Sequence, residues 1–258
     1  MADVLLQREG PVAWIRLNRP ERLNAFGQQL KDELAAAWEE FNADPGLRVG
    51  ILTGTGRAFC VGRDIKEQSE QLGGETDVDT YTSRFLGKNR LALTVITPGE
   101  KPLISAVNGF ALGLGMFLMC AGDIRIAADT AEVGVPELPT GVLGPWYLTA
   151  SELLPRAVSA ELILMGERIS AQRAYEIGLI NKVVPAAELE STARSYAERL
   201  AAFPQEHLRA TLRLMRRDHT GPREELMLEM DDVIRGLYAR ADTAEMASAF
   251  LSKQRTVV

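Results

Sequence analysis

Short apolar runs alternate with amphipathic helical patterns over the first half of the chain. The run Val12–Leu17 alternates in polarity and is rich in bulky residues, which predicts a strand. Between Gln28 and Phe41 the apolar residues recur at helical spacing, which predicts an amphipathic helix. Further apolar runs predict strands over 49–53, 103–107 and 124–127. Strands separated by helices indicate an α/β fold with crossover connections.

The second half of the chain has a mostly helical pattern. Ser170 stands where it would cap a helix that ends at Gly178. The mixed pattern gives way to an all-helical one near Phe203 and Pro204, which predicts a boundary between residues 1–203 and 204–258. The predicted helices cover 171–177, 188–202, 204–217 and 223 to about 251.

The segment 68–82 is polar, acidic and contains Gly73-Gly74. Such a composition favours a loop or a short helix, and long polar loops often lie at the entrance of a site.

Composition excludes several classes of protein. A chain of 258 residues that is 46% hydrophobic can bury a large core. Its formal charge of −6 argues against nucleic-acid binding, which requires a basic face. With only Cys60 and Cys120, a disulfide scaffold is not expected, and both are interpreted as small buried hydrophobes.

No targeting or membrane segment is predicted. The first ten residues lack a basic region followed by an apolar run. The longest apolar stretch, 110–121, is too short and too rich in glycine to span a bilayer. We expect a cytoplasmic protein with no membrane partner.

The first candidate motif, Gly54–Asp64, follows the strand 49–53. Glycines at a strand end let the backbone approach a ligand, and exposed N–H groups there can bind an anion or a polarised carbonyl. An ordinary turn leading into a helix explains the same residues equally well. The motif is neither a Walker loop nor a Rossmann fingerprint.

The second motif, Asn108–Gly115, opens an apolar helix. The first N–H groups of a helix have no partner within it, so they can stabilise an oxygen that gains negative charge. Close packing of helix on strand through small glycines is the alternative, and both can hold. The helix itself carries no carboxylate.

The third motif, Gly134–Gly141, contains Glu137 in an otherwise apolar, proline-rich run. A carboxylate facing a dry cavity would have a raised pKa, which suits a general base. A solvated or ion-paired loop glutamate is the alternative.

In order and spacing, these motifs resemble the crotonase superfamily, the enoyl-CoA hydratase/isomerase family, over nearly the full chain. The resemblance implies a spiral of ββα units with an acyl-CoA site over 1–203. It also implies a helical trimerisation region over 204–258, with a homotrimer or homohexamer as the assembly. The segments that carry it are 17–25, 57–65, 101–109, 122–128 and 166–174.

The resemblance also implies roles for individual residues. The two backbone N–H donors of the family's oxyanion hole map to Arg63 and Leu114. The segment that contacts CoA maps to Arg63, Asp64, Ile65 and Lys66. Arg22 is expected near the CoA phosphates, and Lys253 is expected to reach a nucleotide bound by a neighbouring subunit. For these basic side chains, a solvated surface charge is the alternative.

The chain departs from the family at one position. Hydratases of this family use two glutamates to activate water; the second maps to Glu137, but the first maps to Phe117. A phenylalanine neither orients water nor accepts a proton. Loss of one acid/base group costs about 10²–10⁴-fold in rate, so efficient hydration is not expected.

A single base above an oxyanion hole resembles the Δ3-Δ2-enoyl-CoA isomerases. In that interpretation, Glu137 moves a proton from C2 to C4 of a 3-enoyl-CoA, and the N–H groups of Arg63 and Leu114 hold the dienolate. Coenzyme A enters as part of the thioester substrate. No permanently bound cofactor and no metal are expected.

Three alternatives remain open. Trp146 and Tyr147 map to the far end of the acyl pocket, where a phenol could serve thioester decarboxylation, although aromatic packing also explains them. A substitute second acid would restore hydratase chemistry. The third alternative is a non-catalytic scaffold that binds CoA esters, against which the retained Glu137 weighs. The candidate acids are Glu67, Glu70, Glu75, Asp77 and Asp79.

Overall fold

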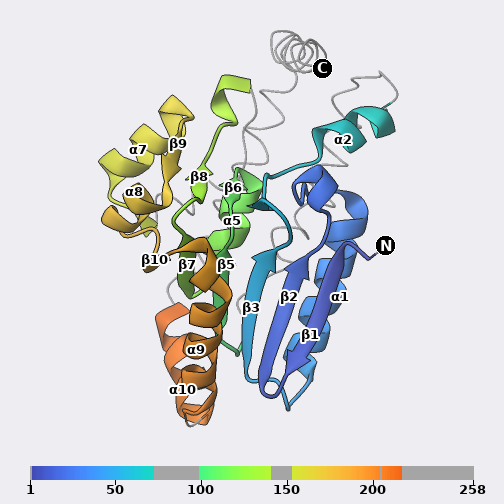
Figure 1. The fold of residues 1–258 in the computed structure, drawn as a ribbon, viewed down its shortest axis with the longest axis vertical. Coiled ribbons are helices and arrows are strands. Elements are labelled where there is room, and N and C mark those ends of the chain that lie inside the picture. The colour runs from blue at the N-terminus through green and yellow to red at the C-terminus, as the bar shows by residue number, and fades with distance from the viewer. Residues whose placement is uncertain (1, 73–98, 141–152, 204, 217–258) are drawn as a thin grey trace.

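In this computed structural model, the described residues are 2–72, 99–140, 153–203 and 205–216, and their strands form two sheets (Figure 1). The larger sheet has the order β1-β2-β3-β5-β7-β10, and the smaller has the order β4-β6-β8-β9. The strands are β1 Val4–Glu9, β2 Val12–Leu17, β3 Val49–Gly54, β4 Ala58–Cys60, β5 Leu103–Val107, β6 Phe110–Leu112, β7 Ile124–Ala128, β8 Glu132–Gly134, β9 Arg168–Ser170 and β10 Lys182–Val184.

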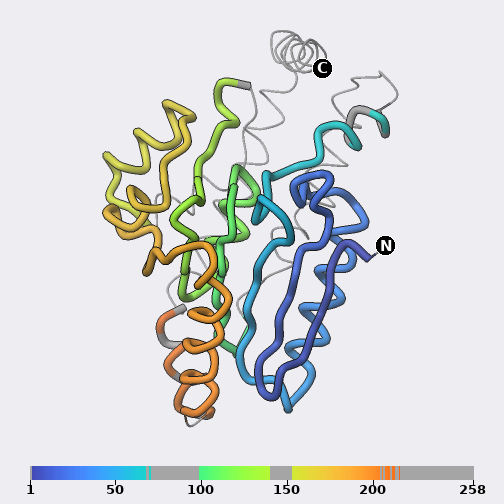
Figure 2. Tube along the Cα trace, in the orientation of Figure 1, coloured from blue at the N-terminus to red at the C-terminus, as the bar shows by residue number. Residues whose placement is uncertain are grey.

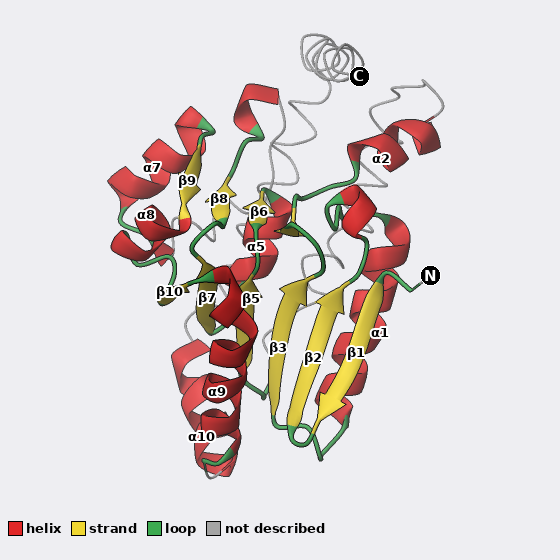
Figure 3. Ribbon diagram, in the orientation of Figure 1, coloured by secondary structure: helices red, strands yellow, loops and turns green. Residues whose placement is uncertain are grey.

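The helices lie between and around these sheets (Figure 3). They are α1 Gln28–Ala43, α2 Ile65–Leu72, α5 Leu114–Cys120, α7 Arg156–Met165, α8 Ala171–Glu176, α9 Leu189–Ala201 and α10 Gln205–Arg216. Short 3₁₀ turns are η1 Pro20–Arg22, η3 Leu138–Thr140 and η4 Ala186–Glu188.

Successive pairs of strands alternate between the two sheets. β3, β5 and β7 are parallel neighbours in the larger sheet. The strands that directly follow them, β4, β6 and β8, are parallel neighbours in the smaller sheet. The run β5-β6-α5 is one complete strand-strand-helix unit. This repetition confirms the predicted spiral of ββα units.

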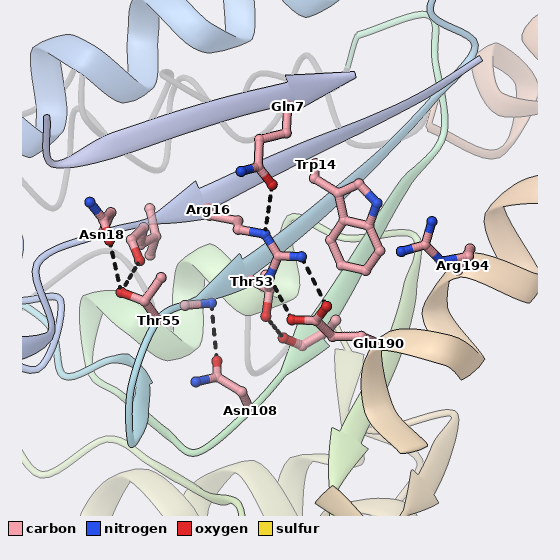
Figure 4. Close-up of polar contacts among 12 residues, drawn as sticks. Gln7, Trp14, Arg16, Asn18, Thr53, Thr55, Asn108, Glu190 and Arg194 are labelled. Atoms are coloured by element: carbon pink, nitrogen blue, oxygen red, sulfur yellow. Dashed lines mark hydrogen bonds and ion pairs between the residues drawn. The ribbon is translucent and has the colours of Figure 1, made fainter. Parts of the chain in front are cut away.

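The larger sheet is covered on both faces. A Cβ placed on Gly50 of β3 would lie 3.1 Å from the Phe41 ring, so this face packs against α1. Trp14, in the next register position, points the other way and lies under Arg194 of α9 (Figure 4). Side chains of successive strand residues alternate between faces, which places the two helices on opposite sides.

Paired charges hold α9 to its face of the sheet (Figure 4). Both guanidinium Nη atoms of Arg16 donate to the Glu190 carboxylate, at 2.6 and 3.0 Å. The Arg16 guanidinium also stacks 4.4 Å from the centre of the Trp14 ring.

The periodic elements agree with the sequence predictions. The helix predicted over 28–41 runs two residues further, and the four predicted strands are present. Ser170 caps α8 as expected, since its Oγ accepts the Arg173 N–H at 3.1 Å, and Gly178 has a φ of +80°. The strands β1, β4, β6, β8, β9 and β10 were not predicted; β4 and β6 lie within the first two glycine-rich motifs, where no strand pattern is visible.

α9 ends at Ala201 and α10 begins at Gln205, so the boundary predicted between residues 203 and 204 falls between these two helices and stays a prediction (Figure 2). Most of the predicted region 204–258, including the helix expected over 223–251, lies outside the described residues. α2 occupies the beginning of the polar segment 68–82, whose residues from 73 onward are likewise not described. Within the part of the chain that is described, no helix is long and apolar enough to cross a membrane.

Candidate active site

The Asn24 side chain connects the early turn to the first motif, and the Asn108 side chain connects the second motif to the first. Asn24 is fully buried, and its Nδ2 donates to the carbonyls of Thr55 and Ala58 at 3.0 and 2.8 Å. Asn108 accepts the Gly54 N–H at 3.0 Å through its Oδ1 (Figure 4). The Asn108 Nδ2 donates to the Ala58 carbonyl as well, at 3.1 Å. The first two motifs therefore meet in space, as a shared site requires.

The backbone after β4 lies directly against the start of α5. A Cβ on Gly62, whose φ is +91°, would come within 2.9 Å of the Leu112 carbonyl oxygen and 3.4 Å of the Leu114 nitrogen. A Cβ on Gly115 would lie 1.9 Å from the Cys60 carbonyl oxygen. Only glycines permit this approach, which brings the segment ending at Arg63 beside Leu114.

The predicted oxyanion donors thus lie on facing segments. Leu114 is the first residue of α5, so its N–H has no carbonyl to bond within the helix. The Gly113 N–H is used differently, because it donates to the Gly134 carbonyl at 2.9 Å. α5 has seven residues. Its aligned dipole is therefore small, and the individual N–H groups rather than the dipole are suited to binding an oxygen.

The third motif places the Glu137 side chain at the start of α5. A Cβ on Gly113 would lie 1.7 Å from the Glu137 Oε1 and 3.2 Å from its Oε2, so the carboxylate rests on the Gly113 backbone. The residue is half-buried, and its Oε2 is enclosed. Burial raises the pKa of Glu137 to about 7 from its ordinary 4.5, while the positive charge of Arg63 acts in the opposite direction. The predicted rise in pKa is therefore found.

Phe117 lies one turn into α5. Its N–H donates to the Gly113 carbonyl at 3.1 Å, and its half-buried ring packs against the core. The position that the family resemblance assigns to a first glutamate is therefore occupied by an apolar ring on the helix that begins beside Glu137.

The candidate substitute acids are only partly within the described residues. Glu67 accepts the Gln28 N–H at 2.9 Å, and its other oxygen lies 3.4 Å from Arg19. Glu70 is exposed on α2. The remaining acids, Glu75, Asp77 and Asp79, lie outside the described residues.

Asp64 holds the start of α2. Its Oδ1 accepts the N–H groups of Lys66 and Glu67 at 3.1 and 3.0 Å, and its Oδ2 lies 2.9 Å from an Arg19 nitrogen. The buried side chain thus has a structural role that the sequence analysis missed, although an aspartate before a helical run is a capping signal. A contact between this segment and CoA stays a prediction.

The other predicted binding residues differ in how they are placed. Ile65 and Lys66 are exposed on the first turn of α2. Arg22 is half-buried at the end of η1. The remaining predicted residues, Trp146, Tyr147 and Lys253, lie outside the described residues.

Cys60 and the distribution of metal-ligating side chains bear on two other kinds of chemistry. Burial raises the pKa of the Cys60 thiol to about 12, so this cysteine stays protonated and is a poor nucleophile. Among residues 2–72, 99–140, 153–203 and 205–216, no three His, Cys, Asp or Glu side chains gather where they could hold a metal ion.

Comparison with known proteins extends over nearly the whole chain. A family model described as enoyl-CoA hydratase/isomerase matches residues 7–257. A Mycobacterium bovis protein named "Probable enoyl-CoA hydratase" is 34% identical over 255 residues, which cover 97% of this chain and 95% of that protein. A carnitinyl-CoA dehydratase of Proteus mirabilis is 37% identical over 76% of this chain and 73% of its own length.

The fold is also similar to solved structures. The crystal structure of carnitinyl-CoA hydratase from Mycobacterium avium matches with a TM-score of 0.86 and 30% sequence identity. The match covers 98% of this chain and 97% of that one.

Proposed function

The chain belongs to the enoyl-CoA hydratase/isomerase family and is an acyl-CoA enzyme, and we propose that it moves the double bond of a 3-enoyl-CoA to the 2-position. The observation that carries this proposal is the single carboxylate of Glu137. It rests against the start of α5 with its pKa raised to about 7, whereas the other family position holds Phe117.

The proposed reaction needs one base and two hydrogen-bond donors. Ionised Glu137 takes a proton from C2 of the substrate. The electrons move into the thioester carbonyl, whose oxygen is held by the N–H groups of Arg63 and Leu114. Protonated Glu137 then returns the proton at C4, so no water is consumed. A pKa near 7 suits both steps, because the same group must accept and release the proton.

Hydration is the second candidate, and the names of the similar proteins favour it, since they are hydratases and a dehydratase. It requires a second acid besides Glu137. Among the described candidates, Glu67 already holds the start of α1 through the Gln28 N–H. Its carboxylate would have to leave that contact in order to orient water.

For the rest of the molecule, we propose that Arg22 and the segment 63–66 contact CoA and that the region 204–258 joins subunits into a homotrimer or homohexamer in the cytoplasm. Light scattering of the full chain and of a chain ending at residue 203 tests the assembly. A monomeric full chain would contradict it.

Matched substrates test the reaction. Purified protein is incubated with 2-enoyl-CoA and 3-enoyl-CoA esters of one chain length, and the products are separated by mass-resolved chromatography. Conversion of the 3-enoyl ester without addition of water supports isomerisation. Rapid formation of a 3-hydroxyacyl-CoA would contradict it and favour hydration. If the CoA esters bind but neither is converted, decarboxylation or a scaffold role becomes the better account.

A further inference from the structure

Gly113 occupies a backbone conformation that other residues rarely adopt. Its φ is +54° and its ψ is −119°, and it immediately precedes α5. A Cβ there would lie 1.7 Å from the Glu137 Oε1 and 2.7 Å from its Cδ. The space that a side chain would fill is therefore taken by the carboxyl group of Glu137.

The pairing of β6 with β8 fixes the relative positions of Gly113 and Glu137. Leu112 of β6 pairs with Gly134 of β8, and the Gly113 N–H then donates to the Gly134 carbonyl at 2.9 Å. Glu137 follows Gly134 within the same motif. The backbone at Gly113 is thus tied to the segment that carries the base.

Gly113 and Gly115, at the start of α5, differ in which atoms an added Cβ would meet. At Gly115 the obstacle is the Cys60 carbonyl, which belongs to the backbone and cannot move aside. At Gly113 the obstacle is the end of a flexible side chain, which can move. A methyl group at position 113 would therefore displace the carboxylate and leave the backbone packing in place.

We propose that Gly113 is the positioning residue for Glu137: because glycine has no side chain, the catalytic carboxylate can occupy the space that a Cβ would fill. The proposal deepens the proposed function and rests on Glu137 as the base. In the Gly113→Ala variant, the carboxylate loses its place against the Gly113 backbone, and a displacement of about 1 Å can cost about 10²-fold in kcat.

The direct test is a double-mutant cycle read out by thermal unfolding, which does not require enzymatic activity. Gly113→Ala is compared in the parent chain and in a Glu137→Ala chain, in which the carboxylate is absent. The strain of a positive φ is present in both, whereas the steric conflict is present only with Glu137. We expect a clearly larger fall in Tm in the parent chain. Equal falls would overturn the proposal.

Gly178→Ala is the matched control. Gly178 also has a positive φ, +80°, but a Cβ there meets no atom within 4 Å. It should lower Tm equally in the two chains and leave kcat unchanged. If Gly113→Ala fails to fold in the parent chain but folds in the Glu137→Ala chain, the proposal holds. If it folds in neither, backbone strain alone explains Gly113 and the proposal fails.

The kinetic readout separates this proposal from the proposed function. Gly113→Ala should lose kcat while its KM for the CoA ester changes little. A parent chain without isomerase activity would contradict the proposed reaction, yet the unfolding cycle would still decide the role of Gly113. Unchanged kcat in Gly113→Ala, in an active parent, would overturn the positioning role.

Discussion

Two glutamates of this chain lie in opposite environments. Glu137 rests on the backbone at the start of α5, and burial raises its pKa to about 7. Glu190 lies on α9, over the face of the larger sheet that carries Trp14 and Arg16. There, two hydrogen bonds from Arg16 hold the pKa of Glu190 below its usual range.

The difference shows that a nearby cation does not by itself decide the charge of a carboxylate. Each glutamate is under the influence of an arginine, but at Glu137 the effect of burial outweighs that of Arg63. At Glu190 the directly bonded Arg16 outweighs burial. The first environment favours proton transfer at the expense of folding stability, and the second anchors a helix at the expense of any acid/base role.

The largest expected effect is on catalysis. Glu137→Gln keeps the shape of the side chain and removes the proton acceptor, so kcat for isomerisation should fall about 10²–10⁴-fold. Steady-state assays with a 3-enoyl-CoA measure it. Glu190→Gln is the matched control and should keep the parent kcat. A Glu137→Gln enzyme that retains half of the parent rate would remove Glu137 from the mechanism.

The next largest effect is on stability. Replacing Glu137 should stabilise the fold at high pH, whereas removing a carboxylate from an ordinary ion pair destabilises it. The pKa of Glu137 is about 7 in the folded chain and 4.5 ordinarily, so its contribution to stability is fully present below pH 4.5 and is lost as pH rises through 7. The difference corresponds to at most about 3 kcal/mol. Glu137→Gln should therefore unfold at a higher temperature than the parent at pH 8. A lower Tm at pH 8 would contradict the burial of an ionised carboxylate.

A third effect concerns Arg63, whose charge holds the pKa of Glu137 down. Arg63→Gln keeps the backbone N–H donor but removes the charge, so the pKa should rise further. The acidic limb of the kcat profile then moves to higher pH, and activity recovers toward the parent value in alkaline buffer. Arg8→Gln, which removes an exposed charge paired with Glu40, is the control. An unmoved limb would show that Arg63 does not act on the base.

The smallest effect is expected at the ion pair between Arg16 and Glu190, which holds α9 to the sheet. Glu190 is 54% exposed and Arg16 is 16% exposed, so solvent screens their pair. Glu190→Gln should cost less than about 1 kcal/mol of unfolding free energy at pH 7. Because the pKa of Glu190 is lowered, this contribution is present above the ordinary glutamate pKa and is lost as pH falls below it. Urea unfolding at pH 7 and pH 3 measures it, and an equal cost at both would contradict the pairing.

The long elements of the fold could be predicted because their patterns are periodic. α1 and the strands β2, β3, β5 and β7 of the larger sheet have enough residues to show a helical or strand pattern. The strands of the smaller sheet have three residues each and lie among glycines, so their pairing comes from the packing of neighbouring units. The spiral itself was inferred from family resemblance and not from any periodicity.

Part of the site could be predicted in the same way. The raised pKa of Glu137 followed from one acid in an apolar, proline-rich run. The contact between Glu137 and Gly113 depends on the pairing of β6 with β8, which no local pattern signals. The role of Arg19 in holding Asp64 was missed because the two residues meet only after folding.

The most direct test of a single-base isomerase is product analysis in ¹⁸O-enriched water. The parent chain is mixed with a 3-enoyl-CoA and stopped at several times, beside Glu137→Gln. We predict a 2-enoyl-CoA of unchanged oxygen mass that forms first and depends on Glu137. A 3-hydroxyacyl-CoA that carries ¹⁸O and forms as fast as any 2-enoyl-CoA would contradict the account.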